Sequence, residues 1–403
     1  MTTQPAGKKD VSFVDNLTRL QVISLDACTR CMQCLEWCPV LDATEDESLT
    51  TPEKIRTYGE IVRSQHGLRA RLFGRPEVSP EVLEKLTQAL FTCTTCGRCG
   101  EVCSVGINTQ RLWPAIRAKM VELGIGPVGA QREIPSIVAQ KHNPYDGDHA
   151  ERFAWIPPEV PVAGRAEIGY FAGCSGAYTA RPMLVGAVTV LHALGIEFTL
   201  FKDEWCCGFP LFIVGELSPM EQMIRHNVDG FAAQGVKHLV VSCPCCMFML
   251  QNHWPYFYGE PLPFDIIHTT QFIKPHIEAG KLKLSKSLDA TITYHDPCYL
   301  SRGTHVIDEP REVLAQIRGA RVVEMRHSRE LSRCCGAGGG IRRGFPEVSI
   351  QMARALLREA EDVGADILAI DCPACYERLH LAQQGFSSSI QVLDLMQLVA
   401  DLL

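Results

Sequence analysis

The chain has 403 residues, of which 46% are hydrophobic and 21% are charged, and its formal net charge at neutral pH is −7. This composition is typical of a soluble globular protein of two or three domains and excludes an extended disordered chain. The excess of acidic residues disfavours nucleic-acid binding, because a phosphate backbone is met by a basic surface.

The first residues, MTTQPAGKKDVSFVDNL, lack the apolar core of a secretory signal, and no run of 18 apolar residues that could span a bilayer follows. The sequence therefore predicts a cytoplasmic protein. Nineteen cysteines in that compartment do not indicate a disulfide framework, since cytosolic thiols are kept reduced. Metal binding or redox chemistry is the remaining explanation, and the cysteine spacing has to distinguish them.

Residues 1–125 are predicted to form a helical domain, with helical patterns at 81–90 and 112–123, and they contain two copies of a C-x-x-C-x-x-C-x-x-x-C motif. The cysteines are Cys28, Cys31, Cys34 and Cys38 in the first copy, and Cys93, Cys96, Cys99 and Cys103 in the second. In ferredoxins this spacing lets three thiolates of one loop bind one [4Fe–4S] cube, while the fourth thiolate binds the other cube. Proline follows the first copy, whereas Ser104 follows the second.

The motif therefore predicts two cubane clusters with exchanged fourth ligands. One cluster takes Cys28, Cys31, Cys34 and Cys103, and the other takes Cys93, Cys96, Cys99 and Cys38. Structural zinc sites also use C-x-x-C, but zinc binds four ligands per ion and gives no reason for this uneven spacing in two copies. More than 50 residues separate the copies, so we expect an α-helical ferredoxin domain rather than the compact bacterial form.

Residues 126–164 are rich in glycine and proline, as in WIPPEVPVAG, and are predicted to be a linker that covers part of the surface. From residue 165 onward short β-rich runs alternate with helical segments, a pattern typical of α/β structure. An internal repeat in this part predicts one α/β module at 165–285 and a second at 286–403. The expected fold is α+β and multi-domain, with a helical ferredoxin domain followed by two tandem α/β modules.

Each module contains a single cysteine, a Cys-Cys-Gly sequence and a C-x-x-C pair. These cysteines are Cys174, Cys206, Cys207, Cys243 and Cys246 in the first module, and Cys298, Cys334, Cys335, Cys372 and Cys375 in the second. The single cysteine and the C-x-x-C pair follow apolar runs, so we expect their sulfurs at the carboxyl ends of strands, where open α/β sheets place their sites. Free cysteine is often buried merely as a small apolar residue, but that does not explain the repetition. The repeat places Ala374 opposite Cys245, which is therefore left over.

This pattern resembles the CCG modules of heterodisulfide reductase catalytic subunits. The order of a helical ferredoxin domain followed by two CCG modules is similar to the D-subunit family of the membrane-linked heterodisulfide reductases, from about Leu17 to the C-terminus. The resemblance implies that each set of five module cysteines holds a noncubane [4Fe–4S] cluster, so that 18 of the 19 cysteines are ligands. It also implies a membrane b-type cytochrome as partner, which would hold this chain on the inner face of the membrane.

Cleavage of a disulfide takes two electrons, whereas each iron–sulfur cluster passes one at a time. We therefore expect electrons to pass from the partner through the cubane clusters to the paired noncubane clusters, with a disulfide such as the coenzyme M–coenzyme B heterodisulfide between them. No G-x-G-x-x-G fingerprint follows a strand, so nicotinamide or flavin binding is not indicated.

Two pairs of residues near the second module's cysteines are further candidates. Arg342 and Arg343 follow the glycine run GAGGG and either bind anionic substrate groups or form a solvated pair. His295 and Asp296 precede Cys298 and either tune the cluster, transfer a proton or support the site structurally.

Two other functions are compatible with the sequence. CCG proteins also resemble the iron–sulfur subunits of glycolate, lactate and anaerobic glycerol-3-phosphate oxidoreductases, which relay electrons while a separate flavoprotein does the chemistry. Similar subunits also occur in sulfur metabolism, where a persulfide or trisulfide on a sulfur-carrier protein is the substrate. Two complete sets of module cysteines favour a reductase over a relay, because a plain relay needs no paired clusters.

Overall fold

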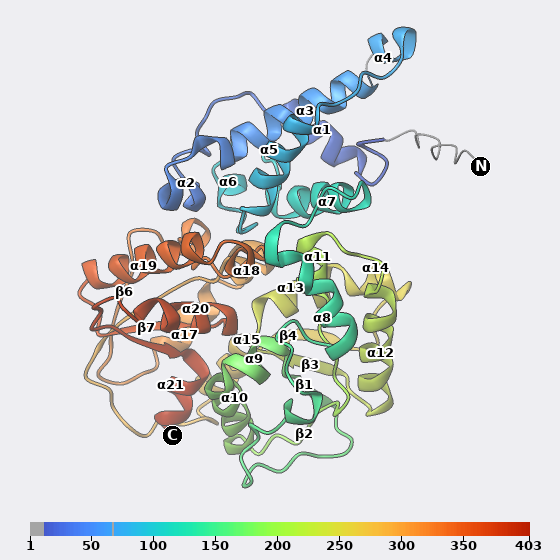
Figure 1. The fold of residues 1–403 in the computed structure, drawn as a ribbon. Coiled ribbons are helices and arrows are strands. Elements are labelled where there is room, and N and C mark those ends of the chain that lie inside the picture. The colour runs from blue at the N-terminus through green and yellow to red at the C-terminus, as the bar shows by residue number, and fades with distance from the viewer. Residues whose placement is uncertain (1–11, 67) are drawn as a thin grey trace.

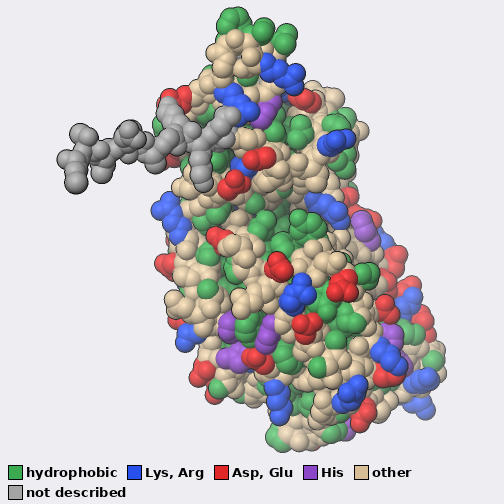
Figure 2. Space-filling view, turned by 90° about the vertical axis from the view of Figure 1, so that its right-hand side faces the viewer, with side chains coloured by type: hydrophobic (Ala, Val, Ile, Leu, Met, Phe, Trp, Pro, Cys, Tyr) green, Lys and Arg blue, Asp and Glu red, His purple; other side chains and the backbone are tan. Residues whose placement is uncertain are grey.

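The computed structural model describes residues 12–66 and 68–403, so the first 11 residues of the predicted 1–125 domain lie outside the described part. Figure 1 shows a helical domain resting on two α/β units that lie side by side. In the face shown in Figure 2, acidic and basic side chains are mixed over the surface, and hydrophobic side chains gather where the upper domain meets the body. Within the described residues, no helix combines the length and the apolar character needed to cross a membrane.

The helical domain surrounds the two ferredoxin-type motifs. Its helices are α1 (Arg19–Ala27), α2 (Pro39–Thr44), α3 (Thr51–His66), α4 (Leu68–Phe73), α5 (Pro80–Phe91), α6 (Arg98–Glu101) and α7 (Thr109–Glu122), with the 3-10 helix η1 (Glu47–Leu49). The helix α5 begins at the N-cap Ser79, whose side chain accepts from the Val82 N–H. Tyr58, Phe91 and Trp113 from α3, α5 and α7 are buried together in one core. The two segments predicted as helical therefore form the long helices α5 and α7.

The segment predicted as a linker contains short helices and packs onto the body. They are the 3-10 helices η2 (Gly129–Glu133) and η3 (His149–Glu151), and the helix α8 (Ile134–Lys141). Ile134 and Val138 of α8 are buried in the same core as Phe209 and Val214 of the first α/β unit. This segment is therefore part of the folded body and is close enough to contribute to its sites.

The first α/β unit contains a four-stranded parallel sheet in the order β2-β1-β3-β4. Its strands are β1 (Ile168–Phe171), β2 (Phe198–Thr199), β3 (His238–Val241) and β4 (Asp265–His268). Its helices are α9 (Cys174–Thr179), α10 (Arg181–Ala193), α11 (Phe209–Val214), α12 (Met220–Ala233), α13 (Pro244–Asn252), α14 (Trp254–Tyr258) and α15 (Thr269–Glu278). Three successive residues are buried in both β1 and β3, so both faces of the sheet are covered.

The second α/β unit repeats this topology, with parallel strands in the order β6-β5-β7-β8. Its strands are β5 (Thr291–Tyr294), β6 (Arg321–Val323), β7 (Ile367–Ile370) and β8 (Gln391–Asp394). Its helices are α16 (Cys298–Thr304), α17 (Asp308–Leu314), α18 (Ile341–Gly344), α19 (Pro346–Asp362), α20 (Pro373–Gln383) and α21 (Leu395–Asp401), with the 3-10 helix η4 (Arg329–Leu331). The register is also repeated, because Tyr170 pairs with Val240 in the first unit and Tyr294 pairs with Ala369 in the second. The predicted α+β fold with two tandem modules is confirmed.

The two units pack against each other through equivalent elements. The contact of α10 with α21 has a counterpart in the contact of α17 with α15, and the contact of α13 with α16 has a counterpart in that of α20 with α9. Each contact thus recurs with the units exchanged, as an approximate two-fold axis between them requires. Because α9, α13, α16 and α20 follow the carboxyl ends of central strands, this packing brings those ends of the two sheets together.

One buried arginine docks the helical domain on both α/β units. Arg117 in α7 is 0% exposed, and its guanidinium donates to the carbonyl oxygens of Leu90 and Cys93 in its own domain. It also donates to the carbonyl oxygen of Ile213 in the first unit at 2.7 Å and to that of Gly339 in the second at 2.9 Å. Gly339 has a φ of 64°, and an added Cβ would lie 2.2 Å from the Cys93 carbonyl oxygen, so only glycine permits this approach.

Replacing Arg117 with methionine should destabilise the protein by about 3 kcal/mol or more, because four buried carbonyl groups lose a shared donor. Urea-induced unfolding of anaerobically prepared protein, followed by circular dichroism, measures the loss. Arg326 is exposed, and Arg326→Met should change the stability by no more than about 0.5 kcal/mol. Equal stability of Arg117→Met and the unchanged protein would contradict the docking role of Arg117.

Candidate functional site

The structure brings together the thiols of the first predicted cubane site. A small cavity in the helical domain has four of them in its wall, namely Cys28, Cys31, Cys34 and Cys103. Burial, followed by the nearby thiols of Cys99, Cys28 and Cys103, raises the pKa of Cys34 to about 12. Cys31 is exposed, so this group of thiols reaches the surface of the helical domain.

The thiols of the second predicted cubane site lie deeper. Burial raises the pKa of Cys38 to about 12, and the nearby thiols of Cys93 and Cys99 contribute to the shift. The Cys93 sulfur accepts a hydrogen bond from the Thr95 N–H at 3.3 Å, and the Cys99 sulfur lies 3.2 Å from Thr109 Oγ1. The fourth cysteine of the first motif is therefore close to the second motif, as the exchanged pairing requires.

Cys96, the remaining member of the second site, also contacts the second α/β unit. Its contact with the Cys334 thiol, followed by burial, raises the pKa of Cys96 well above the ordinary value. Gln110 Nε2 donates to the carbonyl oxygens of both Cys96 and Cys298, at 3.0 and 3.2 Å. Arg302 Nε donates to the Cys96 carbonyl oxygen at 2.7 Å. This junction between the helical domain and the second unit was not predicted, because motif spacing carries no information on contacts between domains.

In each α/β unit the five predicted cysteines form one connected group. Their thiols interact in the same order in both units: the single cysteine, the first and second of the adjacent pair, and then the second and first of the C-x-x-C pair. The order is Cys174, Cys206, Cys207, Cys246, Cys243 in the first unit and Cys298, Cys334, Cys335, Cys375, Cys372 in the second. After the adjacent pairs, Gly208 and Gly336 have φ values of 91° and 80°, a left-handed turn that glycine permits.

The chain positions these thiols at helix starts that follow the strands. Cys174 and Cys298 are the first residues of α9 and α16, which come shortly after β1 and β5. Cys243 and Cys372 are the N-caps of α13 and α20, which follow β3 and β7. The predicted place at the carboxyl ends of strands is confirmed for these four cysteines. The partial positive charge of a helix start favours a thiolate over a thiol.

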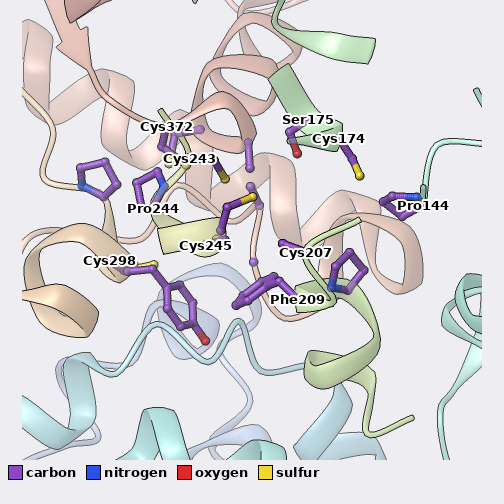
Figure 3. Close-up of a pocket in the computed structure, with 18 of the residues that line it drawn as sticks. Pro144, Cys174, Ser175, Cys207, Phe209, Cys243, Pro244, Cys245, Cys298 and Cys372 are labelled. Atoms are coloured by element: carbon purple, nitrogen blue, oxygen red, sulfur yellow. The ribbon is translucent and has the colours of Figure 1, made fainter. Parts of the chain in front are cut away.

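One cavity lies between the two groups of five cysteines. Figure 3 shows Cys174 and Cys207 of the first unit and Cys298 and Cys372 of the second around the same space. The rest of the wall is largely apolar and includes Pro144, Phe209, Pro210, Pro244, Pro297, Tyr299, Ala337 and Ala374. A mostly apolar cavity with few charged groups is typical of a small-molecule site.

Cys245 also lies in the wall of this cavity. Contact with the Cys243 thiol, followed by burial, raises the pKa of Cys245 well above the ordinary value, and Cys372 and Cys298 of the other unit act in the same direction. Its sulfur is therefore placed between the two groups, as Figure 3 shows. The repeat alone marked Cys245 only as left over, because a comparison of the modules does not reveal what faces their interface.

Of the two arginines after the glycine run, Arg342 lines the cavity and Arg343 does not. Arg342 donates to the Glu377 carboxylate and to the Tyr145 hydroxyl, both at 2.5 Å. These two contacts hold its guanidinium at the wall of the cavity and leave other N–H groups available. Arg343 instead pairs with Glu133 at 2.9 Å near the surface.

His295 and Asp296, which lie shortly before Cys298, have different environments. His295 is 1% exposed, and neither of its ring nitrogens makes a hydrogen bond within the described residues. A ring nitrogen of His295 and the sulfurs of Cys335 and Cys375 all lie within 4.8 Å of one another. Asp296 instead pairs with Arg311 at 2.6 Å, which supports a structural role for this carboxylate.

The linker contributes a buried ion pair that we did not predict. Arg152 and Glu204 are both fully buried and paired, and Arg152 Nη1 lies 3.7 Å from the Cys174 sulfur. The Glu204 carboxylate accepts the backbone N–H groups of Ala172 and Gly173, each at 2.9 Å, and so fixes the turn before Cys174. No sequence signal marks these residues, because they are 52 positions apart and meet only in the folded chain.

The thiol groups fit iron–sulfur clusters. All nineteen cysteines are free, although several sulfurs are in contact, such as those of Cys335 and Cys375 at 2.9 Å. Burial raises the pKa of several of these thiols, as for Cys34 and Cys174, so a bound cation is needed to hold them as thiolates. Groups of four and five cysteines provide the sulfur donors that iron–sulfur clusters use.

Known proteins show the same combination of domains. The model of the cysteine-rich domain CCG matches residues 168–251 and 292–380, and that of the 4Fe-4S dicluster domain matches residues 24–107. The D subunit of the dihydromethanophenazine:CoB–CoM heterodisulfide reductase of Methanosarcina barkeri is 41% identical over 96% of each chain. The B subunit of the fumarate reductase (CoM/CoB) of Methanothermobacter marburgensis is 28% identical over 93% of this chain and 72% of that protein.

A solved structure of a hypothetical protein from Helicobacter pylori is similar in fold. Its TM-score is 0.58 at 10% sequence identity, over 95% of this chain and 74% of that one. At this identity the likeness concerns the fold alone.

Cys245 and its neighbour Cys246 provide a matched test of the assignment of ligands. Cys246→Ala should remove one cluster, about four irons per chain, whereas Cys245→Ala should leave the iron content unchanged. Iron and acid-labile sulfide analysis of anaerobically purified variants measures both results. A loss of iron in Cys245→Ala would show that Cys245 is a ligand and that the repeat misidentifies the spare cysteine.

Proposed function

The chain belongs to the D-subunit family of heterodisulfide reductases, and we propose that it is the iron–sulfur catalytic subunit of a complex that reduces a disulfide to two thiols. The observation that carries this proposal is the single cavity whose wall contains cysteines of both five-cysteine groups. The names of the relatives favour the coenzyme M–coenzyme B heterodisulfide as the substrate.

We propose four clusters for the four groups of thiols. The cubane clusters are bound by Cys28, Cys31, Cys34 and Cys103, and by Cys93, Cys96, Cys99 and Cys38. The noncubane clusters are bound by Cys174, Cys206, Cys207, Cys243 and Cys246, and by Cys298, Cys334, Cys335, Cys372 and Cys375. When bound, two clusters on opposite sides of the cavity would together supply the two electrons that cleavage of an S–S bond requires.

The residues of the chain would orient the substrate and keep water away from it. Phe209 and Tyr299 are packed edge to face with ring centroids 4.8 Å apart, and both lie in the cavity wall. This apolar wall suits the alkyl groups beside a disulfide. Arg342 presents a positive charge at the same wall, which suits an anionic group at one end of the substrate. The disulfide would thus be held between the two cysteine groups.

The positions of the four thiol groups support one order of electron transfer. The group that contains Cys31 reaches the surface, the group that contains Cys96 lies deeper, and the Cys96 thiol contacts Cys334 of the second unit. Electrons would therefore enter at the helical domain and reach the second unit before the first. Met32 and Val105 are exposed hydrophobic residues beside the surface group, where a donor protein could dock. We propose a membrane b-type cytochrome as this donor, which would place the chain on the inner face of the membrane.

The anaerobically purified protein should contain about sixteen irons and sixteen sulfides per chain, four of each per cluster. With a reduced viologen as artificial donor it should reduce a low-molecular-weight disulfide. Cys335→Ala should abolish this activity and leave the ferredoxin-type electron paramagnetic resonance signals intact, because Cys335 lies in the second unit alone. About eight irons in the unchanged protein would contradict the proposed clusters.

Two other results would point to the other candidate functions. A protein with all its iron that reduces no disulfide, yet accepts electrons from a flavoprotein, would be a relay. Activity confined to a persulfide or trisulfide on a sulfur-carrier protein would identify that carrier as the substrate.

Arg342 and Arg343 allow a matched test of anion binding in the cavity. Arg342→Met should raise the KM for an anionic disulfide about 10- to 100-fold, because the substrate loses one charge-assisted hydrogen bond. The KM for a neutral disulfide, such as bis(2-hydroxyethyl) disulfide, should change much less, and Arg343→Met should change neither value. Equal effects of Arg342→Met on both disulfides would show that Arg342 supports the cavity wall but does not bind the anionic group.

A further inference from the structure

The surroundings of the two five-cysteine groups differ in several polar residues, and the proposed chemistry does not use one of them, His295 of the second unit. His295 lies at the carboxyl end of β5, where its backbone N–H donates to the Ala369 carbonyl oxygen at 3.0 Å. Its ring is buried, with a nitrogen near the sulfurs of Cys335 and Cys375. Neither ring nitrogen makes a hydrogen bond within the described residues.

The first unit has an apolar ring at the equivalent position. The internal repeat aligns Tyr170 with Tyr294, so Phe171 takes the place of His295. An added Cβ at Gly173 would lie 3.1 Å from the Cys246 sulfur and 3.9 Å from the Phe171 ring, so this ring lies near the sulfur equivalent to that of Cys375. The fold therefore accepts a ring without nitrogen beside the same sulfur.

At a second position, too, the second unit has a nitrogen-bearing side chain where the first unit has an apolar one. The repeat aligns Cys246 with Cys375, so Met249 in the first unit takes the place of Arg378 in the second. Arg378 is buried, its Nε has no partner within the described residues, and its positive charge is close enough to Cys335 to interact with it. The second group of thiols therefore has two polar nitrogen-bearing neighbours where the first group has Phe171 and Met249.

Packing alone does not explain these nitrogens. A buried polar group without a hydrogen bond costs about 1–3 kcal/mol, and Phe171 and Met249 show that apolar side chains fill the same positions. The nearby carboxylate of Asp296 is already paired with Arg311, so it does not serve as the missing acceptor. The sulfurs of Cys335 and Cys375 lie beside the ring and can accept a hydrogen bond.

We propose that His295 donates an N–H hydrogen bond to a sulfur of the iron–sulfur cluster in the second unit, and that Arg378 adds positive charge on the same side. This inference rests on the proposed presence of that cluster. Hydrogen bonds and positive charge near the sulfurs stabilise the more negatively charged, reduced state, and so raise the reduction potential. On the first unit's side, the charge of Arg152 beside Cys174 is balanced by Glu204. The two clusters on either side of the cavity are therefore electronically unequal.

The test replaces His295 with the residue of the first unit. In His295→Phe, a redox titration monitored by electron paramagnetic resonance should show a more negative reduction potential for the second unit's cluster. The signal of this cluster is assigned as the one that is lost in Cys372→Ala. His295→Gln keeps an N–H donor and should restore part of the shift. Arg378→Met should shift the same potential in the same direction, and the potentials of the other clusters should stay unchanged.

Nitrogen labelling gives a readout that does not depend on activity. Protein grown with ¹⁵N-histidine should show a weak nitrogen coupling to the second unit's cluster, and the coupling should be absent in His295→Phe. The control is His253→Phe, because His253 is a partly buried histidine that packs against Phe212 with ring centroids 4.2 Å apart. It should change neither the coupling nor the potential.

Several results would overturn the inference. If His295→Phe contains the second unit's cluster and its reduction potential and nitrogen coupling are unchanged, the inference is wrong. This result would leave the proposed function intact. A coupling as large as that of a histidine bonded directly to iron would overturn the hydrogen bond. Iron analysis that shows no cluster in the second unit of the unchanged protein would instead overturn the proposed function on which the inference rests.

Discussion

The approximate two-fold packing of the two α/β units is the constraint on which the candidate site depends. A single unit would leave its five thiols at the open edge of a sheet, in contact with water. Packing of α13 on α16 and of α9 on α20 covers both edges at once and leaves one shared cavity between them. In this partly buried space electrostatic interactions are stronger than in water. The charge of Arg342 and the polarity of each neighbouring side chain therefore affect the binding of a ligand there.

Docking of the helical domain combines apolar packing, as of Val40 with Ile341 and Met352, with buried hydrogen bonds. Arg117 donates to carbonyl groups of all three parts of the chain, and Gln110 and Arg302 connect the Cys96 loop to the second unit. Buried carbonyl groups need such donors, because each unsatisfied group would cost free energy. The same contacts fix Cys96 beside Cys334, so the route from the helical domain to the cavity is set by the interactions that hold the domains together.

The repeated backbone carries side chains that are not repeated. The buried Tyr170 hydroxyl bonds to Ser242 at 2.6 Å, whereas the equivalent Tyr294 hydroxyl bonds to the Asp371 carboxylate at 3.3 Å. The exchange of Phe171 for His295 is a second difference of this kind. A substrate between two sites with the same thiol geometry but different surroundings would meet two unequal sides, which suits a disulfide whose halves differ.

The sequence alone determined the groups of thiols and the strand ends that carry them, because cysteine spacing and short apolar runs are local properties. It indicated the helical domain and the repeat for the same reason. Only the tertiary structure decided what lies between the groups. It placed Cys245 and Arg342 in one cavity, brought Arg152 from the linker to Cys174, and joined Cys96 to Cys334. These contacts join residues far apart in the chain, and they follow from how the domains pack, for which a single sequence contains no periodic signal.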